Sequence, residues 1–268
     1  MRKLSIITLT VLALSFTGCE ELENLCGIGA DDLGFAEDYN THLNAAIYIY
    51  QQADRALRDS TLKATGTAEI DGANCTRTVD SLIVDFGNGS IGNDGRTRYG
   101  SYRMAYTGDY MMPGSSASLK LMNYRENDQA YEGSLALSNT TSGTNPVVQV
   151  NVTEITVDTL SLSGQMAAEW LAGFETETDP ADDSFQLTGG LTLANTSSNE
   201  TFAGNIQSPL LIEYSCDYTF VSGVVDLVPS SPDYPQLSMD FIPGDCANLF
   251  TATLDCEGNQ LKFSYPIK

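Results

Sequence analysis

The sequence has few of the residues from which many enzymes build an active site. Its single histidine, His42, would have to be the general base of any Ser-His-Asp triad or Cys-His pair. The sequence also has no GxSxG nucleophile elbow. No CxxC pair and no cluster of cysteine and histidine indicates a zinc site. These absences favour a non-enzymatic protein without a cofactor.

Basic residues are also scarce. Lysine and arginine number 13 against 35 aspartates and glutamates, which gives a formal net charge of −22. The nearest approach to a basic stripe is Arg96, Arg98 and Arg103, which is too sparse to hold a phosphate backbone. The charge therefore excludes nucleic acid as a partner and disfavours anionic lipid head groups.

No apolar run is long enough for a good membrane-spanning helix, which needs about 20 residues. The longest run near the start covers residues 4–16 and follows the basic pair Arg2 and Lys3. Small residues, Thr17 and Gly18, come next, before Cys19. A basic start, a short apolar stretch and small residues at the cleavage site predict a secretory signal peptide over residues 1–18.

The segment Thr17-Gly18-Cys19 resembles the lipobox of bacterial lipoproteins. The resemblance implies that Cys19 becomes the lipidated N-terminus of the mature chain and anchors it in the outer membrane, since several acyl chains make anchoring stable. Glu20, Glu21 and Glu23 resemble the acidic signal that sends Bacteroidetes lipoproteins to the cell surface. The periplasmic face of the outer membrane is the alternative location.

Five cysteines remain after Cys19, and an exported chain can form disulfides between them. An odd number leaves at least one cysteine unpaired or paired between chains. A strand predicted over 249–254 would hold Cys246 and Cys256 too far apart to bridge. Cys216 could pair with Cys246 or with Cys75, and the sequence does not choose between them.

The mature chain begins with a flexible acidic tether over residues 19–34, followed by a helix over residues 35–64. Apolar residues recur there at spacings of three and four, as in Tyr39, Leu43 and Tyr50. Polar residues such as Gln52 and Asp54 fill the opposite face, so the pattern predicts an amphipathic helix that packs against a sheet or a partner.

Residues 67–268 alternate between apolar and polar types and are interrupted by turn residues, which predicts an antiparallel β domain. The expected fold is mainly β, a multi-stranded sheet or sandwich with one N-terminal helix. A barrel, one long curved sheet, and two β halves of about 67–163 and 164–268 remain open. The predicted strands are 77–86, 98–108, 116–125, 130–138, 147–155, 157–163, 166–173, 185–193, 200–206, 210–221, 223–228, 236–242, 249–255 and 260–266.

Several short motifs in this domain resemble a family of uncharacterised Bacteroidetes outer-membrane lipoproteins of the flavobacterial type. The resemblance covers roughly residues 75–265, and its motifs include Val84-Asp85-Phe86-Gly87, Asn123-Tyr124 and Glu132-Gly133. It implies an exported location and a β-rich fold, and it implies no activity. The segment 87–92 lacks a cysteine that the family carries, which leaves the disulfide pattern open.

One acidic segment is a candidate calcium site, because hard oxygen ligands in a loop suit Ca²⁺. The EF-hand spacing is absent, and a solvated loop is the competing interpretation. The candidate ligands are Glu175, Glu177, Asp179, Asp182 and Asp183.

Two further sets of residues would suit a glycan. Tyrosines that shared an exposed sheet face could stack on sugars, although half-buried tyrosines are ordinary β-sheet residues. Two convergent carboxylates could act as the acid and base of a glycosidase. The tyrosines are Tyr99, Tyr102, Tyr106, Tyr110, Tyr124 and Tyr131, and the carboxylates are Asp85, Asp94, Glu126, Asp128 and Glu169.

The sequence therefore favours a lipid-anchored lipoprotein whose β domain binds a ligand, such as a glycan, or plays a structural role, without catalysis. A cell-surface glycan-processing hydrolase that uses paired carboxylates is the alternative. A third hypothesis is that the helix docks on an outer-membrane protein partner. A cleft with two convergent carboxylates would favour the hydrolase.

Overall fold

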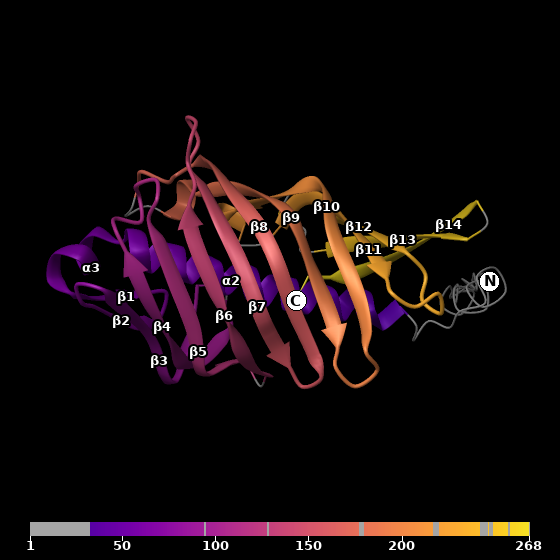
Figure 1. Cartoon of the computed structure of the whole chain (residues 1–268), viewed down its shortest axis with the longest axis horizontal. Helices are drawn as coiled ribbons and strands as arrows, with labels where there is room; N and C mark the ends of the chain where they lie inside the picture. The colour runs from indigo at the N-terminus through magenta and orange to yellow at the C-terminus, as the bar shows by residue number, and fades with distance from the viewer. Residues whose placement is uncertain are drawn as a thin grey trace, which may run out of the picture.

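The computed structural model describes residues 33–267 except 94, 128, 177–179, 217–219, 242–245, 247–248 and 257 (Figure 1). The predicted signal peptide, Cys19 and the predicted tether up to residue 32 lie outside the described residues. Fourteen strands form one sheet, in which each strand pairs antiparallel with its neighbours in the chain. The predicted mainly β, antiparallel fold with one long N-terminal helix is confirmed, and its architecture is one continuous sheet.

The strands follow one another across the sheet in sequence order. They are β1 Thr67–Ile70, β2 Ala73–Arg77, β3 Ser81–Ile91, β4 Thr97–Thr107, β5 Ser116–Glu126, β6 Gln129–Asn139, β7 Val147–Val157, β8 Leu160–Ala172, β9 Ser184–Asn195, β10 Glu200–Glu213, β11 Phe220–Pro229, β12 Leu237–Phe241, β13 Leu249–Cys256 and β14 Asn259–Pro266. Two short 3₁₀ turns, η2 Pro180–Asp182 and η3 Tyr214–Cys216, lie in the connections.

Two strands that the sequence pattern divides are continuous in the structure. β8 joins the predicted strands 157–163 and 166–173 through Gly164, and β10 continues past a register shift between Asn205 and Leu210. The boundary at about 163 and 164, suggested for two β halves, falls inside β8 of the continuous sheet. β1 and β2 were not predicted, because four and five residues around a tight turn carry too little alternation to detect.

The predicted helix over 35–64 is two helices, α2 Gly34–Arg58 and α3 Ser60–Thr65. The break lies at Asp59, which leaves helical geometry and accepts a hydrogen bond from the backbone N–H of Leu62. Gly66, with a φ of 79°, ends α3 in the left-handed region that favours glycine. Within the part of the chain that the structure describes, no helix is both long and apolar enough to cross a membrane.

The sheet curls around α2, which runs across its strands on the inner side (Figure 1). Inward-facing side chains of the strands and the apolar residues of the helix form one continuous core. Trp170 of β8 belongs to this core and is 1 % exposed, with its ring 5.2 Å from Phe185 and its indole N–H donating to the hydroxyl of Tyr50. The segment 166–173, whose sequence could also fit a helical turn, is therefore a strand.

The polar face of α2 is buried as well as its apolar face. Gln51, Gln52, Asp54 and Arg58 are all at most 3 % exposed. An amphipathic helix ordinarily keeps such residues in water. Here the curled sheet encloses them, so the helix has become an internal element of the domain, and its polar groups need partners inside the fold.

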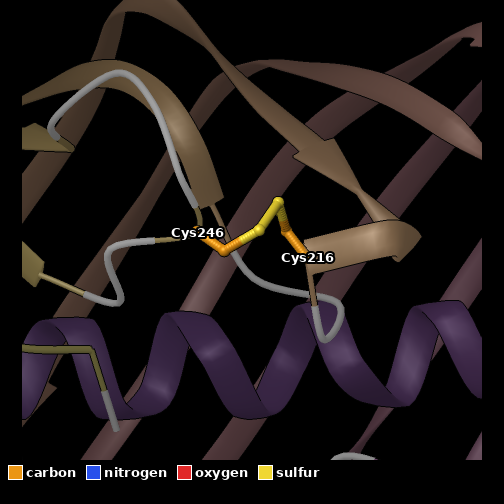
Figure 2. The surroundings of a disulfide bond; sticks show 2 residues. All are labelled: Cys216 and Cys246. Carbon is orange, nitrogen blue, oxygen red and sulfur yellow. A yellow bond between two sulfur atoms is a disulfide. The ribbon is translucent and has the colours of Figure 1, made fainter.

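A disulfide between Cys216 and Cys246 joins the connection after β10 to the connection after β12, above α2 (Figure 2). It settles the pairing that the sequence leaves open. Cys75 of β2 is a buried free thiol, and burial raises its pKa to about 12. A thiol in that state is a poor nucleophile at neutral pH.

Candidate functional site

The described residues of the predicted calcium loop do not gather around a common point. Asp183 is buried and faces Arg58, whereas Asp182 is exposed and accepts a hydrogen bond from the hydroxyl of Thr176. Glu175 is exposed, and Glu177 and Asp179 lie outside the described residues. No group of three or more metal-ligating side chains occurs among the residues that the structure describes.

The predicted carboxylate pair is not assembled from its described candidates. Glu126 points inward and forms ion pairs with Arg96 and Arg98. Glu169 accepts hydrogen bonds from Asn145 and Gln186 on the exposed side of β8. Asp85 lies on β3, and Asp94 and Asp128 lie outside the described residues.

Most of the tyrosines that could have stacked on sugars are core residues. Tyr102, Tyr110, Tyr124 and Tyr131 are each at most 5 % exposed. Tyr106 packs against Arg77 and donates a hydrogen bond to the backbone carbonyl of Thr78. Tyr99 is partly exposed on the outer face of β4, where its ring lies 5.8 Å from the guanidinium of Arg125.

His42 is a structural residue of α2. It is 3 % exposed, and its Nδ1 lies 2.8 Å from the carbonyl oxygen of Asp38, one turn earlier in the helix. Burial lowers its pKa from the usual value, so the ring is neutral at pH 7. Its surroundings give it no access to a substrate.

The polar face of α2 is held by two buried networks, of which the first is the Arg58 cluster, formed by Asp54, Arg58, Tyr110 and Asp183. The guanidinium of Arg58 lies 2.7 Å from Asp54 and 2.6 Å from Asp183. The hydroxyl of Tyr110 donates to Asp54 at 2.9 Å. The guanidinium also covers the ring of Trp170, 4.4 Å from its centre.

The Arg58 cluster holds one cation between two carboxyl groups. Burial alone would lower the pKa of Arg58, but Asp54 and Asp183 together raise it, so Arg58 stays charged. Burial raises the pKa of Asp183 to about 7, against the opposing effect of Arg58, and it raises the pKa of Asp54 as well. The cluster therefore favours a state in which one carboxyl group keeps its proton near neutrality.

The second network is the Arg98 cluster, formed by Arg98, Glu126, Tyr48 and Asp71. Arg98 is fully buried, 3.0 Å from Glu126, and its guanidinium lies 3.3 Å from the centre of the Tyr48 ring. The hydroxyl of Tyr48 donates to Asp71. The Arg58 cluster joins α2 to the connections before β5 and β9, and the Arg98 cluster joins α2 to β4 and β5. The polar groups bind each other closely, which indicates a role in stability.

The outer face of the sheet carries an open depression, the β5–β7 hollow, with a volume of about 780 Å³. That volume lies within the range of small-molecule sites, roughly 300–1,000 Å³. It is lined by Lys120, Leu121, Met122, Asn123, Tyr124, Arg125, Ala130, Tyr131, Glu132, Gly133, Ser134, Thr153 and Glu154.

The hollow forms where bulges on three neighbouring strands lie side by side. Register shifts fall between Lys120 and Tyr124 on β5, around Gly133 on β6, and just before Ile155 on β7. Each bulge bends its strand and adds a residue to one side of the pairing. In consequence two successive residues point outward on β5, Met122 and Asn123, and two on β7, Thr153 and Glu154.

The backbone at the hollow adopts conformations that side chains ordinarily avoid. Asn123 and Glu154 each have a φ of 52°, and Gly133 has a φ of 128°. A Cβ on Gly133 would collide with the carbonyl oxygen of Glu154. The Glu154 backbone is fixed by the Ser163 hydroxyl, 2.9 Å from its nitrogen. A glutamate in the left-handed region is uncommon, and residues of this kind cluster at functional sites.

Positive and negative side chains line different strands of the hollow. Lys120 and Arg125 lie on β5, whereas Glu132 lies on β6 and Glu154 on β7. Neighbouring strands are about 4.8 Å apart, so β5 and β7 lie roughly 10 Å apart across the hollow. Met122 is 49 % exposed and adds an apolar surface. The hollow thus offers hydrogen-bond donors, acceptors and an apolar contact within one small area.

Sequence reasoning did not identify the hollow as a site, although two motifs of the family resemblance lie in it. These are Asn123-Tyr124 and Glu132-Gly133, which supply two of the three bulges. Comparison with known proteins adds nothing to this geometry, since no protein family, no curated protein and no solved structure matches the chain.

Proposed function

We propose that this chain is an exported lipoprotein, anchored in the outer membrane through Cys19, whose β domain binds a glycan at the β5–β7 hollow without chemically changing it. The lipobox resemblance and the likeness to Bacteroidetes lipoproteins support the anchor and the cell-surface location. The sealed interior supports the choice of an outward-facing site, because the buried polar groups of the two clusters already bind each other.

The observation that carries the binding proposal is the alignment of the three bulges. Glu154 in the left-handed region costs of order 1–3 kcal/mol, and the surrounding sheet has to supply that energy. Bulges bend a sheet, and register shifts on β3 and β4 show that the bending extends beyond the hollow. The bulges do, however, bring Asn123 and Glu154 to the outer surface beside Lys120 and Glu132, which is the arrangement a ligand site needs.

A saccharide suits the hollow better than a simple ion does. Its hydroxyl groups both donate and accept hydrogen bonds, so they match a lining that mixes Lys120 and Arg125 with Glu132 and Glu154. An inorganic anion or a metal cation would meet repulsive charges on one side of the hollow. The exposed thioether of Met122 offers apolar surface for the C–H face of a sugar.

The binding proposal is tested on a glycan array with the chain from residue 20 onward, followed by calorimetric titration of the strongest saccharide. Glu154→Gln and Lys120→Ala should each weaken binding by tenfold or more. Glu69→Gln is the matched control, because Glu69 is exposed on β1, away from the hollow. Equal affinity in all variants would place the ligand elsewhere.

A glycan-processing hydrolase is the second candidate, because Glu132 and Glu154 line the same hollow on adjacent strands. Glycosidases use two carboxylates roughly 5–10 Å apart, a separation that side chains on adjacent strands can reach. Incubation of the saccharides that bind, followed by an assay for new reducing ends, distinguishes the two functions. Turnover that disappears in Glu132→Gln would replace the binding proposal with catalysis, and absence of turnover at full binding supports it.

The anchor is tested by metabolic labelling with a fatty acid. The wild-type chain should incorporate label and Cys19→Ser should not. Accessibility of the labelled protein to an added protease in intact cells then separates the cell surface from the periplasmic face. A wild-type chain that takes up no label would contradict the lipoprotein assignment.

A further inference from the structure

The sheet has two edges, and they are built differently. β1, at one edge, has four residues and packs against α3, which follows directly from α2. β14, at the other edge, has eight residues and extends at the far end of the molecule from α3 (Figure 1). Among the described residues, β14 pairs with β13 alone. A long edge strand with free backbone groups is a template for another strand.

The inward-facing side chains of β14 are incompletely covered. Leu261, Phe263 and Tyr265 are only partly buried, although they pack against the core. On the neighbouring strand, Phe250 and Ala252 are fully buried. The difference arises because β13 has a strand on each side and β14 has one. An additional strand at this edge would complete the burial of all three side chains.

The geometry points to a second copy of this chain as the occupant, with the two β14 strands pairing antiparallel about a two-fold axis at Phe263. In this register Leu261 lies opposite Tyr265 of the second copy, and Phe263 lies opposite its counterpart. Lys262 lies opposite Ser264. Apolar residues then meet apolar residues on the inner face, and no two like charges are directly opposite. Axes at the adjacent residues are worse, because an axis at Lys262 places two lysines together and one at Ser264 places Lys262 against Pro266.

The charge of the chain permits pairing at this edge. The chain carries a formal net charge of −22, so two copies repel each other over most approaches. The segment 259–266 contains no carboxylate, and its one charged residue is Lys262. Edge-to-edge pairing thus brings together a stretch of each copy that is free of negative charge.

The dimer should be weak in solution and stronger on a membrane. A pair of eight-residue strands buries less than the roughly 1,200 Å² of a stable interface. Confinement to a membrane raises the effective concentration of one copy near another, so weak pairing becomes populated there. This membrane effect rests on the proposed lipid anchor, whereas the pairing register does not.

The register is tested by cysteine cross-linking of the full lipidated chain in phospholipid vesicles. Lys262→Cys and Ser264→Cys replace exposed side chains, so the fold is retained. A mixture of the two variants should form a disulfide-linked dimer under mild oxidation. Each variant alone should form little, because identical positions lie diagonally, about 7–8 Å apart. The unmutated chain shows the background from its own cysteines.

A charge variant gives an independent readout. Ser264→Lys places a lysine opposite Lys262 of the second copy and should weaken self-association at least tenfold in analytical ultracentrifugation. Ser118→Lys makes the same change on an exposed position of β5 and should have no effect. The proposal is overturned if no cross-link forms, if Lys262→Cys cross-links with itself as well as in the mixture, or if both lysine variants behave alike. Cross-linking to a different protein alone in intact cells would also overturn it.

Repeating the cross-linking with unlipidated Cys19→Ser at high concentration separates this proposal from the anchor. If the unlipidated chain cross-links in the predicted register but the wild type takes up no fatty acid, the pairing stands and the anchor fails. If labelling succeeds and no cross-link forms on vesicles, the anchor stands and the pairing is wrong.

Discussion

Polar residues on the inner side of the sheet are buried and paired with one another, whereas those around the hollow on its outer face are exposed to solvent. On the inner face, Asp54, Arg58 and Asp183 are sealed against one another at contact distances below 3 Å. On the outer face, Lys120 and Glu154 lie exposed around an open hollow. The first arrangement costs desolvation energy and recovers it through pairing. The second leaves polar groups available to a ligand.

This difference identifies where function can reside. A buried charge cluster with shifted pKa values is often evidence for a catalytic site. In this protein the cluster joins the helix to the sheet that encloses it, and the same residues that shift the pKa of Asp183 also shut it off from solvent. The outer hollow is instead distinguished by its backbone, in which Asn123 and Glu154 adopt a positive φ. We therefore place the proposed binding site at the hollow, where the backbone is unusual, and interpret the cluster as a structural feature.

The largest expected effect comes from removing the shared cation of the inner face. Arg58→Leu leaves Asp54 and Asp183 buried without their guanidinium, and breaking a buried ion pair in this way costs about 3–5 kcal/mol. Urea denaturation measures the free energy of unfolding. Arg103→Leu, an exposed arginine on β4, is the control and should change it by less than about 0.5 kcal/mol. Similar losses in the two variants would contradict the assigned role of the cluster.

A smaller loss is expected from filling the bulge on β6. Gly133→Ala introduces a Cβ that collides with the Glu154 carbonyl, at a φ that alanine disfavours, so it should cost about 1–3 kcal/mol and disturb ligand binding. Gly143→Ala, in the loop between β6 and β7, has open space around its Cβ and serves as the control. Thermal unfolding of both variants tests this, and an unaffected Gly133→Ala would show that the bulge is not fixed.

A pH effect comes next in size. The folded-state pKa of Asp183 is raised to about 7 by burial, above its unfolded value near 4. The folded state therefore holds this proton more tightly, and the resulting stability is present at acidic pH and is lost as pH rises through about 7. Asp183→Asn cannot lose a proton, so its stability relative to the wild type should increase from pH 4 to pH 7. A constant difference across that range would show that folding does not raise the pKa of Asp183.

The smallest effect on stability is expected at the hollow itself. Glu154→Gln and Lys120→Ala remove exposed groups and should change the free energy of unfolding by less than about 0.5 kcal/mol while they reduce saccharide affinity tenfold or more. Unfolding and binding measured on the same preparations separate the two properties. A large loss of stability in either variant would mean that the outer residues support the fold, which would remove the distinction between the faces.

The sequence predicted those parts of the fold that depend on local pattern. Alternation in segments such as Leu82–Phe86 and Tyr102–Tyr106 identified strands, and spacing of three and four identified α2. Local sequence pattern could not predict that Gln52 and Asp54 are buried, because their burial depends on how far the sheet curls around the helix. Asp183 was likewise assigned to a loop with its acidic neighbours, since its partner Arg58 is 125 residues away in the chain.

The hollow was missed for a related reason. Bulges depend on the register between strands, and one strand's sequence carries little information about its neighbour's register. A signal does exist in hindsight: the alternation of inner and outer residues slips by one at Met122-Asn123 and at Thr153-Glu154. A glycine, Gly133, stands between these two positions on the middle strand. Breaks in alternation of this kind on successive strands would have indicated a bend.

The most direct test of the contrast between the faces is hydrogen–deuterium exchange with and without the saccharide selected on the array. The account predicts added protection in β5, β6 and β7 around the hollow, with α2 unchanged because it is already sealed within the sheet. Protection gained along α2 or near Asp54, Arg58 and Asp183 would show that the ligand enters the interior, and it would contradict the assignment of binding to the outer face.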